Sequence, residues 1–230
     1  MALGCRIITD FPRPSQDLIR EFEGMAVADL DDSMSKISAV RHKILAFNDQ
    51  PVVGTAFTIK LPHGDNLMFR AAIQYAKPGD VIVIDAGGFE DRAVIGEVTV
   101  RMCVARGVRG IICDGAIRDS AVLSELPNFS VFARAVSPNG PYFNGPGEVN
   151  VPIVCGGQIV NPGDIVVGDS DGIVFIDPAD AAHILDATRA ARAKEEIMLK
   201  QIEETGTCDQ SWIDTKLQKL GCEIITPEIK

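Results

Sequence analysis

The sequence predicts an α/β fold, in which short buried strands alternate with helices. Two runs, Val81–Asp85 and Ile111–Cys113, contain consecutive apolar residues of the kind found in strands that are covered on both faces. Turn residues and segments with helical spacing separate these runs. Such alternation is typical of a sheet whose face carries helices.

The chain is expected to begin with a helical arm. Ser15 can cap a helix, because a serine hydroxyl accepts hydrogen bonds from the free N–H groups of a first turn. An acidic stretch, Val27–Met34, comes next. The apolar positions after the cap follow helical spacing at Leu18, Phe22 and Met25.

The middle of the chain is expected to form the sheet and its helices. One helix should run from Leu67 to Ala76, with Asp65 or Asn66 as its cap, and another from near Gly96 until Gly107 stops it. The strands are predicted at Val52–Lys60, Val81–Asp85, Ile111–Cys113, Val131–Val136 and Val151–Val154.

A long helix is expected from Pro178 to Thr205, with Asp177 as its cap and Gly206 beyond its end. At 1.5 Å per residue it would be about 40 Å long, more than the core of one domain needs. One of its faces alternates spacings of four and three residues, as in a helix that packs along another surface. The residues of that face are Ile184, Thr188, Ala191, Glu195, Met198 and Ile202.

The length of 230 residues suits one domain with helical additions. We therefore expect a single domain over residues 1–230. Its parts are a helical arm (1–35), an α/β core (36–177), and a C-terminal helix and tail (178–230).

The segment Val108–Ser120 contains the main candidate for a functional site. Its apolar run leads to Gly115, which we expect to turn the backbone sharply, and Arg118 and Asp119 follow. A guanidinium group suits a substrate carboxylate or a developing oxyanion, and a carboxylate can bind a divalent cation. A solvated surface pair or a helix cap is the alternative interpretation.

Two neighbouring segments favour the functional interpretation. The strand before the pair ends in Asp85–Gly88, whose glycines offer a backbone that a ligand can approach closely. The helix that begins near Gly96 would direct free N–H groups into the same crevice, where they could bind a small carboxylate. Glu97 would lie beside that position.

In their order and spacing, Asp85–Gly88, Ala93–Glu97 and Arg106–Asp119 resemble the signature of a known family. It comprises the 4-hydroxy-4-methyl-2-oxoglutarate/4-carboxy-4-hydroxy-2-oxoadipate aldolases and includes the RraA-like regulators of ribonuclease activity. The resemblance covers the chain from about Asp29 to the long C-terminal helix. It implies a swivelling three-layer β/β/α sandwich of the phosphohistidine-domain type.

The resemblance also implies an activity, that of a class II pyruvate aldolase. Such an enzyme cleaves a 4-hydroxy-2-oxo dicarboxylate or tricarboxylate into pyruvate and a second 2-oxo acid, and often decarboxylates oxaloacetate as well. By resemblance, Asp119 would bind Mg²⁺ or Mn²⁺, and Arg118 would stabilise charge on the substrate's carbonyl oxygen. The substrate carboxylate would bind to the N–H groups of Gly96, Glu97, Val98 and Thr99.

A neighbouring subunit is expected, again by resemblance, to complete the site in a homotrimer or hexamer. Glu195 would come from the C-terminal helix, although Glu196 fits the same role, and Asp32 would come from the N-terminal region beside Asp31. Glu97 and Glu195 would hold the water shell of the metal. From the sequence alone, Glu195 could instead pair with a lysine, and Asp32 could cap a helix.

Composition excludes several other classes of protein. With 22 basic and 32 acidic side chains, the net charge of −10 argues against general binding to nucleic acids or anionic membranes. Small molecules, metal ions and copies of the chain are the expected partners. The N-terminal segment is not of the signal-peptide type and no apolar run could span a bilayer, so we expect a cytoplasmic protein. The six cysteines form no C-x-x-C pair, which argues against structural zinc.

Two rival functions remain. An RraA-like regulator would bind and inhibit a ribonuclease without catalysis, but members of that type typically lack the acid after the arginine, which is present here as Asp119. A Schiff-base aldolase could use Lys60, at the end of a predicted strand. For the aldolase of class II, we expect the loop Pro138–Gly147 to influence the choice of substrate.

Overall fold

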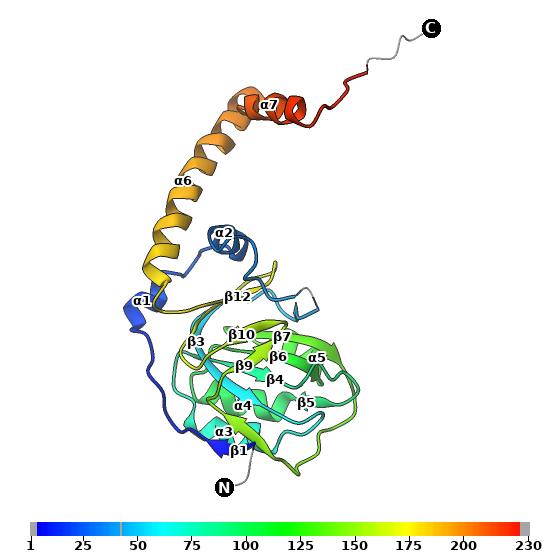
Figure 1. The fold of residues 1–230 in the computed structure, drawn as a ribbon. Helices are drawn as coiled ribbons and strands as arrows, with labels where there is room; N and C mark the ends of the chain where they lie inside the picture. Colours follow the sequence, from blue (N-terminus) through cyan, green and yellow to red (C-terminus); the bar gives the residue numbers. More distant parts are fainter. Residues whose placement is uncertain (1–3, 42, 226–230) are drawn as a thin grey trace. The chain divides into compact units, whose positions relative to one another are not determined.

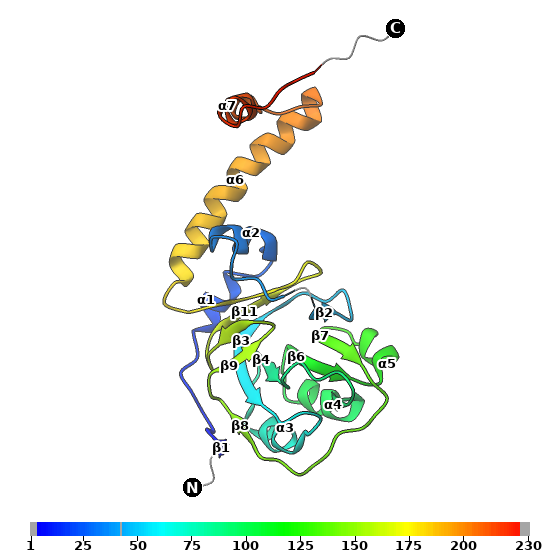
Figure 2. The same ribbon diagram turned by 45° about the vertical axis from the view of Figure 1, so that its right-hand side comes forward.

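The computed structural model describes residues 4–41 and 43–225 (Figure 1). The chain divides into two compact units, residues 1–188 and 189–230. The first unit confirms the predicted three-layer β/β/α arrangement, with helices on one face of a large mixed sheet and a small two-stranded sheet on the other (Figure 2).

The central sheet has parallel strands in its middle. β3 (Val52–Lys60), β4 (Asp80–Asp85), β6 (Gly110–Ile117) and β7 (Ser130–Val136) pair in that order, all parallel. Because these strands are covered on both faces, nearly all their residues are buried. The other members of this sheet are β1 (Cys5–Ile7), β2 (Leu45–Ala46), β5 (Ala93–Ile95), β8 (Gly147–Val149), β11 (Ile165–Gly168) and β12 (Ile173–Ile176).

A helical layer covers one face of the sheet. The helical layer contributes apolar side chains to a core between the helices and the sheet. Its elements are α3 (Leu67–Ala72), the 3₁₀ turn η1 (Ile73–Tyr75), α4 (Glu97–Ala105) and α5 (Ser120–Ser124). The opposite face packs against the antiparallel pair β9 (Ile153–Cys155) and β10 (Gln158–Val160). β5 pairs with β6 and leads directly into α4. The start of α4 therefore lies next to the end of β6.

The predicted helical arm forms two short helices. The Oγ of Ser15 accepts a hydrogen bond from the Leu18 N–H at 3.2 Å, which confirms the expected cap of α1 (Gln16–Arg20). α2 (Val27–Ser33) follows, and both helices pack with β11, β12 and the beginning of α6 around a third apolar cluster. Arg13 anchors the chain before α1 through two 2.8 Å hydrogen bonds to the Asp80 carboxylate.

Two predicted helix boundaries are wrong. α3 ends at Ala72, earlier than expected, and η1 continues the turn to Tyr75. The N-cap residue is Asn66, whose side chain makes no capping bond, whereas the Asp65 Oδ1 accepts from the Leu67 N–H at 2.9 Å. The long helix α6 (Ala181–Thr205) begins at Ala181, because the Asp177 carboxylate caps a turn by accepting from the Ala179 N–H. Its predicted end is confirmed, with Gly206 at a φ of +76° just beyond it.

The second unit comprises most of α6 and the helix α7 (Ser211–Lys219). Several of its large apolar side chains are exposed: Ile197, Met198, Leu199, Ile202, Trp212 and Leu220. Among the residues that the structure describes, no helix combines the length and apolar character needed to cross a membrane.

Candidate functional site

The Arg-Asp pair lies at the end of a longer strand than expected. β6 continues through Gly115 to Ile117, so the prediction of a sharp turn at Gly115 is wrong. The register with β7 shifts between Cys113 and Ala116, and a Cβ on Gly115 would lie 2.8 Å from the Cβ of Ala86. Glycine is therefore needed here for close strand packing rather than for a turn.

The change of chain direction occurs at Asp119 itself. This residue adopts the left-handed conformation, with φ 58° and ψ 32°, at the position before α5. A residue with a Cβ pays about 1 kcal/mol or more in this region, although aspartate tolerates it better than most. The side chain makes no capping bond to α5, the helix that follows it.

The Asp119 carboxylate instead caps the neighbouring helix α4. Its Oδ2 accepts from the Glu97 N–H at 2.9 Å and lies 3.8 Å from the Nε of Arg118. Within the described part of the chain, its second oxygen, Oδ1, has no hydrogen-bond donor. One carboxylate oxygen is thus held in place while the other is available to a ligand.

Arg118 is placed by two close backbone approaches. A Cβ on Gly96 would lie 3.0 Å from the Nε of Arg118 and 2.8 Å from the Oδ2 of Asp119. A Cβ on Gly140 would lie 2.9 Å from an Nη atom of the same guanidinium group. Glycine at both positions leaves room for this side chain, which remains 43% exposed.

The N-terminus of α4 supplies fewer free N–H groups than the sequence suggests. The Gly96 N–H donates to the Oγ1 of Thr99 at 3.3 Å, and the Glu97 N–H donates to Asp119. The N–H groups of Val98 and Thr99 belong to the first turn, where a helix has no internal acceptors. No other acceptor for these two groups occurs among the described residues, so they are the ones open to an anion.

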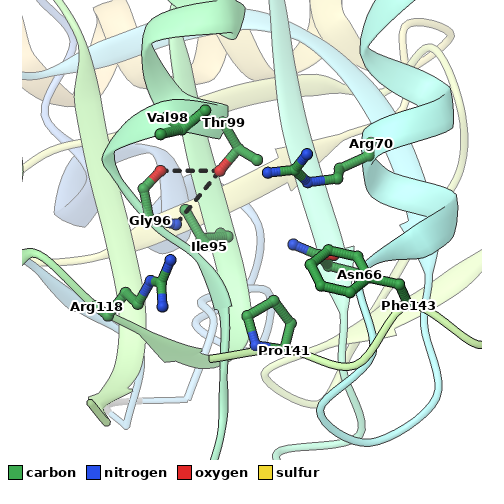
Figure 3. Close-up of a pocket in the computed structure, with 9 residues that line it drawn as sticks. All are labelled: Asn66, Arg70, Ile95, Gly96, Val98, Thr99, Arg118, Pro141 and Phe143. Carbon is green, nitrogen blue, oxygen red and sulfur yellow. Dashed lines mark hydrogen bonds between the residues drawn. The ribbon is translucent and has the colours of Figure 1, made fainter. Parts of the chain in front are cut away.

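Val98, Thr99 and Arg118 border one pocket (Figure 3). Gly96, Val98 and Arg118 lie on one side of it, and Asn66 and Arg70 lie on the other. The remaining lining residues are Ile95, Thr99, Pro141 and Phe143. Arg118 also borders a second hollow, together with Glu97 and Asp119.

Sequence reasoning missed Asn66 and Arg70 as site residues. Asn66 was considered only as a cap, but its Nδ2 donates to the Val94 carbonyl at 3.1 Å, and its Oδ1 is buried without a partner. Arg70 directs its guanidinium into the pocket from α3, and the Phe143 ring lies 5.4 Å away. The spacing of four residues, which puts both on one helix face, was the available signal.

The glycines after β4 do not contribute to this pocket. A Cβ on Gly87 would lie 2.4 Å from the Nε2 of His63, and one on Gly88 would lie 3.4 Å from the guanidinium of Arg134. Both glycines have positive φ. They therefore permit a tight turn against protein side chains, and the expectation that a ligand approaches the chain there stays a prediction.

The carboxylates of Asp31 and Asp32 have different environments. Asp31 accepts from the Ser38 and Ala39 N–H groups, each at 2.9 Å, and so stabilises the turn after α2. Asp32 is exposed and pairs with Lys36 at 3.3 Å. In both views α2 lies away from α4, and Asp32 lines neither of the two hollows beside Arg118 (Figure 2).

The remaining predicted acids form local ion pairs. Glu97 accepts from the Nε of Arg101 at 2.6 Å, one helical turn away. In the second unit, Glu195 pairs with Arg192 at 2.9 Å and Glu196 approaches the same guanidinium at 3.8 Å. Arginine, rather than the lysine considered from sequence, is thus the local partner of Glu195.

The surroundings of Lys60 and of the buried cysteines do not favour catalysis by these side chains. Lys60 is exposed at the end of β3, and the pocket beside it contains neither Arg118 nor Asp119. Burial raises the pKa of the Cys103 thiol to about 12 and raises those of Cys113 and Cys155 as well, which keeps these thiols protonated. No cluster of three potential metal-binding side chains occurs in residues 4–41 and 43–225.

Comparisons with known proteins identify relatives over most of the chain. A protein of Halalkalibacterium halodurans named "Putative 4-hydroxy-4-methyl-2-oxoglutarate aldolase" is 33% identical over 199 residues, covering 86% of this chain and 94% of the relative. The structure of Streptomyces coelicolor RraAS2, described as an unusual member of the RNase ES inhibitor RraA family, is similar with a TM-score of 0.74. It is 25% identical, and the match covers 83% of this chain and 100% of that one.

A second solved structure, of the RNA-processing inhibitor RraA from a Thermus species, has a TM-score of 0.60 and 28% identity. That match covers 66% of this chain and 92% of the other. The RraA-like family model, described as Aldolase/RraA, matches residues 27–175, which include α2, the strands from β2 to β11 and the complete pocket. The chain therefore belongs to the RraA-like family.

Proposed function

We propose that this protein is a class II pyruvate aldolase, dependent on Mg²⁺ or Mn²⁺. It would cleave 4-hydroxy-4-methyl-2-oxoglutarate or 4-carboxy-4-hydroxy-2-oxoadipate into pyruvate and a second 2-oxo acid. The observation that carries the proposal is the pairing of an anion-binding pocket with a carboxylate oxygen free of hydrogen bonds, at the junction of β6 and α4. The name of the 33% identical relative supports the same substrate class.

The residues present fit a hard divalent cation. Asp119 offers Oδ1 at the edge of a solvent-accessible hollow, where its fixed Oδ2 restricts the rotation of the carboxylate. Mg²⁺ accepts a site with one carboxylate because it retains several of its waters. Glu97 borders the same hollow and would hydrogen-bond such waters. When bound, the cation would supply Lewis-acid polarisation of the 2-oxo group.

The protein's own groups would bind and orient the substrate. The Val98 and Thr99 N–H groups at the α4 N-terminus would hold the carboxylate next to the 2-oxo carbon. Arg118 would donate to the 2-oxo oxygen, where negative charge develops as the bond between C3 and C4 breaks. Loss of carbon dioxide from oxaloacetate produces the same charge, so decarboxylation is part of the proposal.

The functional test is pyruvate release from 4-hydroxy-2-oxo acids and from oxaloacetate, with added magnesium and with EDTA. Release that needs the metal is the expected result. Equal turnover in EDTA would contradict the class II mechanism. Inactivation by borohydride in the presence of pyruvate would indicate a Schiff base, for which Lys60 is the candidate.

We propose further that the active form is a cytoplasmic homotrimer or hexamer, in which Asp32 and Glu195 of neighbouring chains complete the site. The exposed apolar residues of the second unit support an assembly, because such side chains lose contact with water when chains associate. Light scattering at micromolar concentration should detect little monomer. An active monomer would remove Asp32 and Glu195 from the mechanism.

The RraA-like relatives make a ribonuclease regulator the second candidate function. Asp119 favours catalysis, since a contact inhibitor has no need for a strained carboxylate at the mouth of a pocket. Inhibition of a ribonuclease by the wild-type chain, together with no pyruvate release from any substrate, would reverse this preference.

A further inference from the structure

The pocket of Figure 3 has an uneven distribution of charge. Arg70 and Arg118 line it from opposite sides, and the N-terminus of α4 adds free N–H groups. None of the residues that line it is acidic. A ligand with a single carboxylate would leave one guanidinium group without an anion.

The guanidinium of Arg70 is not used by the fold. Among the described residues no carboxylate forms an ion pair with it, and its one close partner is the Phe143 ring, at 5.4 Å. The neighbouring arginine Arg92, in contrast, donates to the Gly140 carbonyl and to the Tyr142 hydroxyl. The folded structure thus holds the Arg70 side chain beside the pocket without neutralising it.

The pocket wall also contains a buried side-chain amide, that of Asn66. Asn66 is 3% exposed, and its Oδ1 has no hydrogen-bond partner. Its Nδ2 donates to the Val94 carbonyl, which fixes the orientation of the amide. An unpaired buried acceptor costs about 1–3 kcal/mol.

We propose that Arg70 is a specificity-determining residue, which recognises the second carboxylate of a 2-oxo dicarboxylate. The first carboxylate lies at the N-terminus of α4 beside Arg118. This assignment rests on the proposed function for the orientation of the ligand. The charge of the pocket does not depend on it.

Calorimetric titration of the whole chain in magnesium tests this assignment. The probes are 2-oxoglutarate and 2-oxovalerate, which share a five-carbon 2-oxo skeleton and differ in a terminal carboxylate or methyl group. The wild type should bind 2-oxoglutarate at least about tenfold more tightly, since a charge-assisted contact is lost with the methyl compound. Arg70→Gln should reduce this ratio below about threefold and leave the affinity for 2-oxovalerate within about twofold.

Two further variants complete the design. Arg20→Gln removes one positive charge from an exposed pair with Asp17, and should keep the wild-type ratio. Arg70→Lys keeps the charge without the planar guanidinium group, and should give an intermediate ratio. An Arg70→Gln variant that retains the wild-type ratio, or that loses affinity for both probes equally, would overturn the assignment. So would a wild type that binds both probes alike.

The same proteins separate failure of this assignment from failure of the proposed function. If Arg70→Gln abolishes discrimination in binding but the wild type cleaves no 4-hydroxy-2-oxo acid, the dicarboxylate subsite stands and the aldolase proposal fails. If the wild type cleaves such substrates but Arg70→Gln discriminates normally, the aldolase proposal stands and the subsite fails.

Discussion

Asp119→Asn separates the catalytic role of this residue from its structural role. Asparagine has nearly the same shape and is among the residues that best tolerate left-handed backbone, so the conformation at φ 58° should be kept. Its amide oxygen can still accept from the Glu97 N–H, which places the NH₂ group where Oδ1 was. A cation would then face a donor instead of a negatively charged oxygen.

The expected loss of stability is small. Replacing the charge-assisted bond to Glu97 N–H by a neutral one costs about 1 kcal/mol, and a charge at a helix N-terminus contributes about 0.3–1 kcal/mol. The contact with Arg118 is long, at 3.8 Å between partly exposed groups, and adds at most a few tenths of a kcal/mol. A total of about 1–2 kcal/mol lowers the melting temperature by roughly 2–8 °C in a chain of this size.

The expected loss of activity is much larger. If Asp119 is the protein ligand of the metal, its neutral replacement removes a transition-state contribution of several kcal/mol, which is about 10³-fold or more in rate. The assay is pyruvate release at saturating magnesium, with melting temperature measured in parallel. Asp17→Asn is the control, because it removes an exposed carboxylate that pairs with Arg20.

The reasoning is refuted if Asp119→Asn keeps full metal-dependent turnover, since the metal would then have another ligand. Activity restored by millimolar magnesium would mean that the carboxylate contributes affinity but no part of the catalytic geometry. A loss of melting temperature far beyond the estimate would assign the residue to the fold.

Other substitutions test the surroundings of the same junction and the fold. Arg118→Lys should cost about 2–4 kcal/mol in transition-state stabilisation, measured as kcat/KM, because lysine lacks the planar pair of donors; a loss below threefold would contradict this. Gly96→Ala should lower kcat/KM with little change in melting temperature. The reason is that the new Cβ would displace the Arg118 and Asp119 side chains, whose atoms lie within 3.0 Å of its position. Unchanged activity would show that these side chains need no space at Gly96. Burial raises the pKa of Asp164 from 3.8 to about 6, so its carboxylate destabilises the fold as the pH rises through this range. The free energy of unfolding of Asp164→Asn, measured with urea, should therefore increase relative to wild type by on the order of 2 kcal/mol between pH 3.5 and 7. A difference that stays constant with pH would contradict the raised pKa.

Most strands of the sheet were predictable, because a buried strand appears in the sequence as a short run of apolar residues. The strand Val52–Lys60 has the predicted limits, and α4 ends where Gly107 takes a φ of +77°. These boundaries depend on apolar runs and on single residues with special backbone requirements. Both properties can be recognised without knowing which strands are neighbours.

The wrong predictions concern residues whose type is compatible with two different local structures. A glycine can permit a turn or a close contact, and Gly115 serves the contact because Ala86 of a neighbouring segment lies against it. An aspartate before proline and alanine can cap a helix or a turn, and Asp177 caps a turn. Only the packing of distant segments distinguishes these outcomes.

The same limitation explains which half of the pocket was found. Arg118, Gly96 and Asp119 were predicted to lie together because β6 and α4 are consecutive parts of one motif. Asn66 and Arg70 come from the start of α3 and from α3 itself. The pairing of β3, β4 and β6 brings this helix close to α4. Sequence spacing alone carries no information on that approach.

Several departures from favourable local structure occur around this one pocket. Asp119 has left-handed backbone, the Asn66 oxygen is buried without a partner, and Val98 is an apolar side chain that is 62% exposed. Departures of these kinds also occur elsewhere in the described residues, since Asn150 combines a φ of +55° with a buried Oδ1 that has no partner. What distinguishes Asp119 is its place beside Arg118 and the start of α4. A ligand with a carboxylate group could accept from the open N–H groups of α4. The strain at Asp119 directs a carboxylate toward the position that such a ligand would occupy, which gives this residue a role that stability alone does not explain.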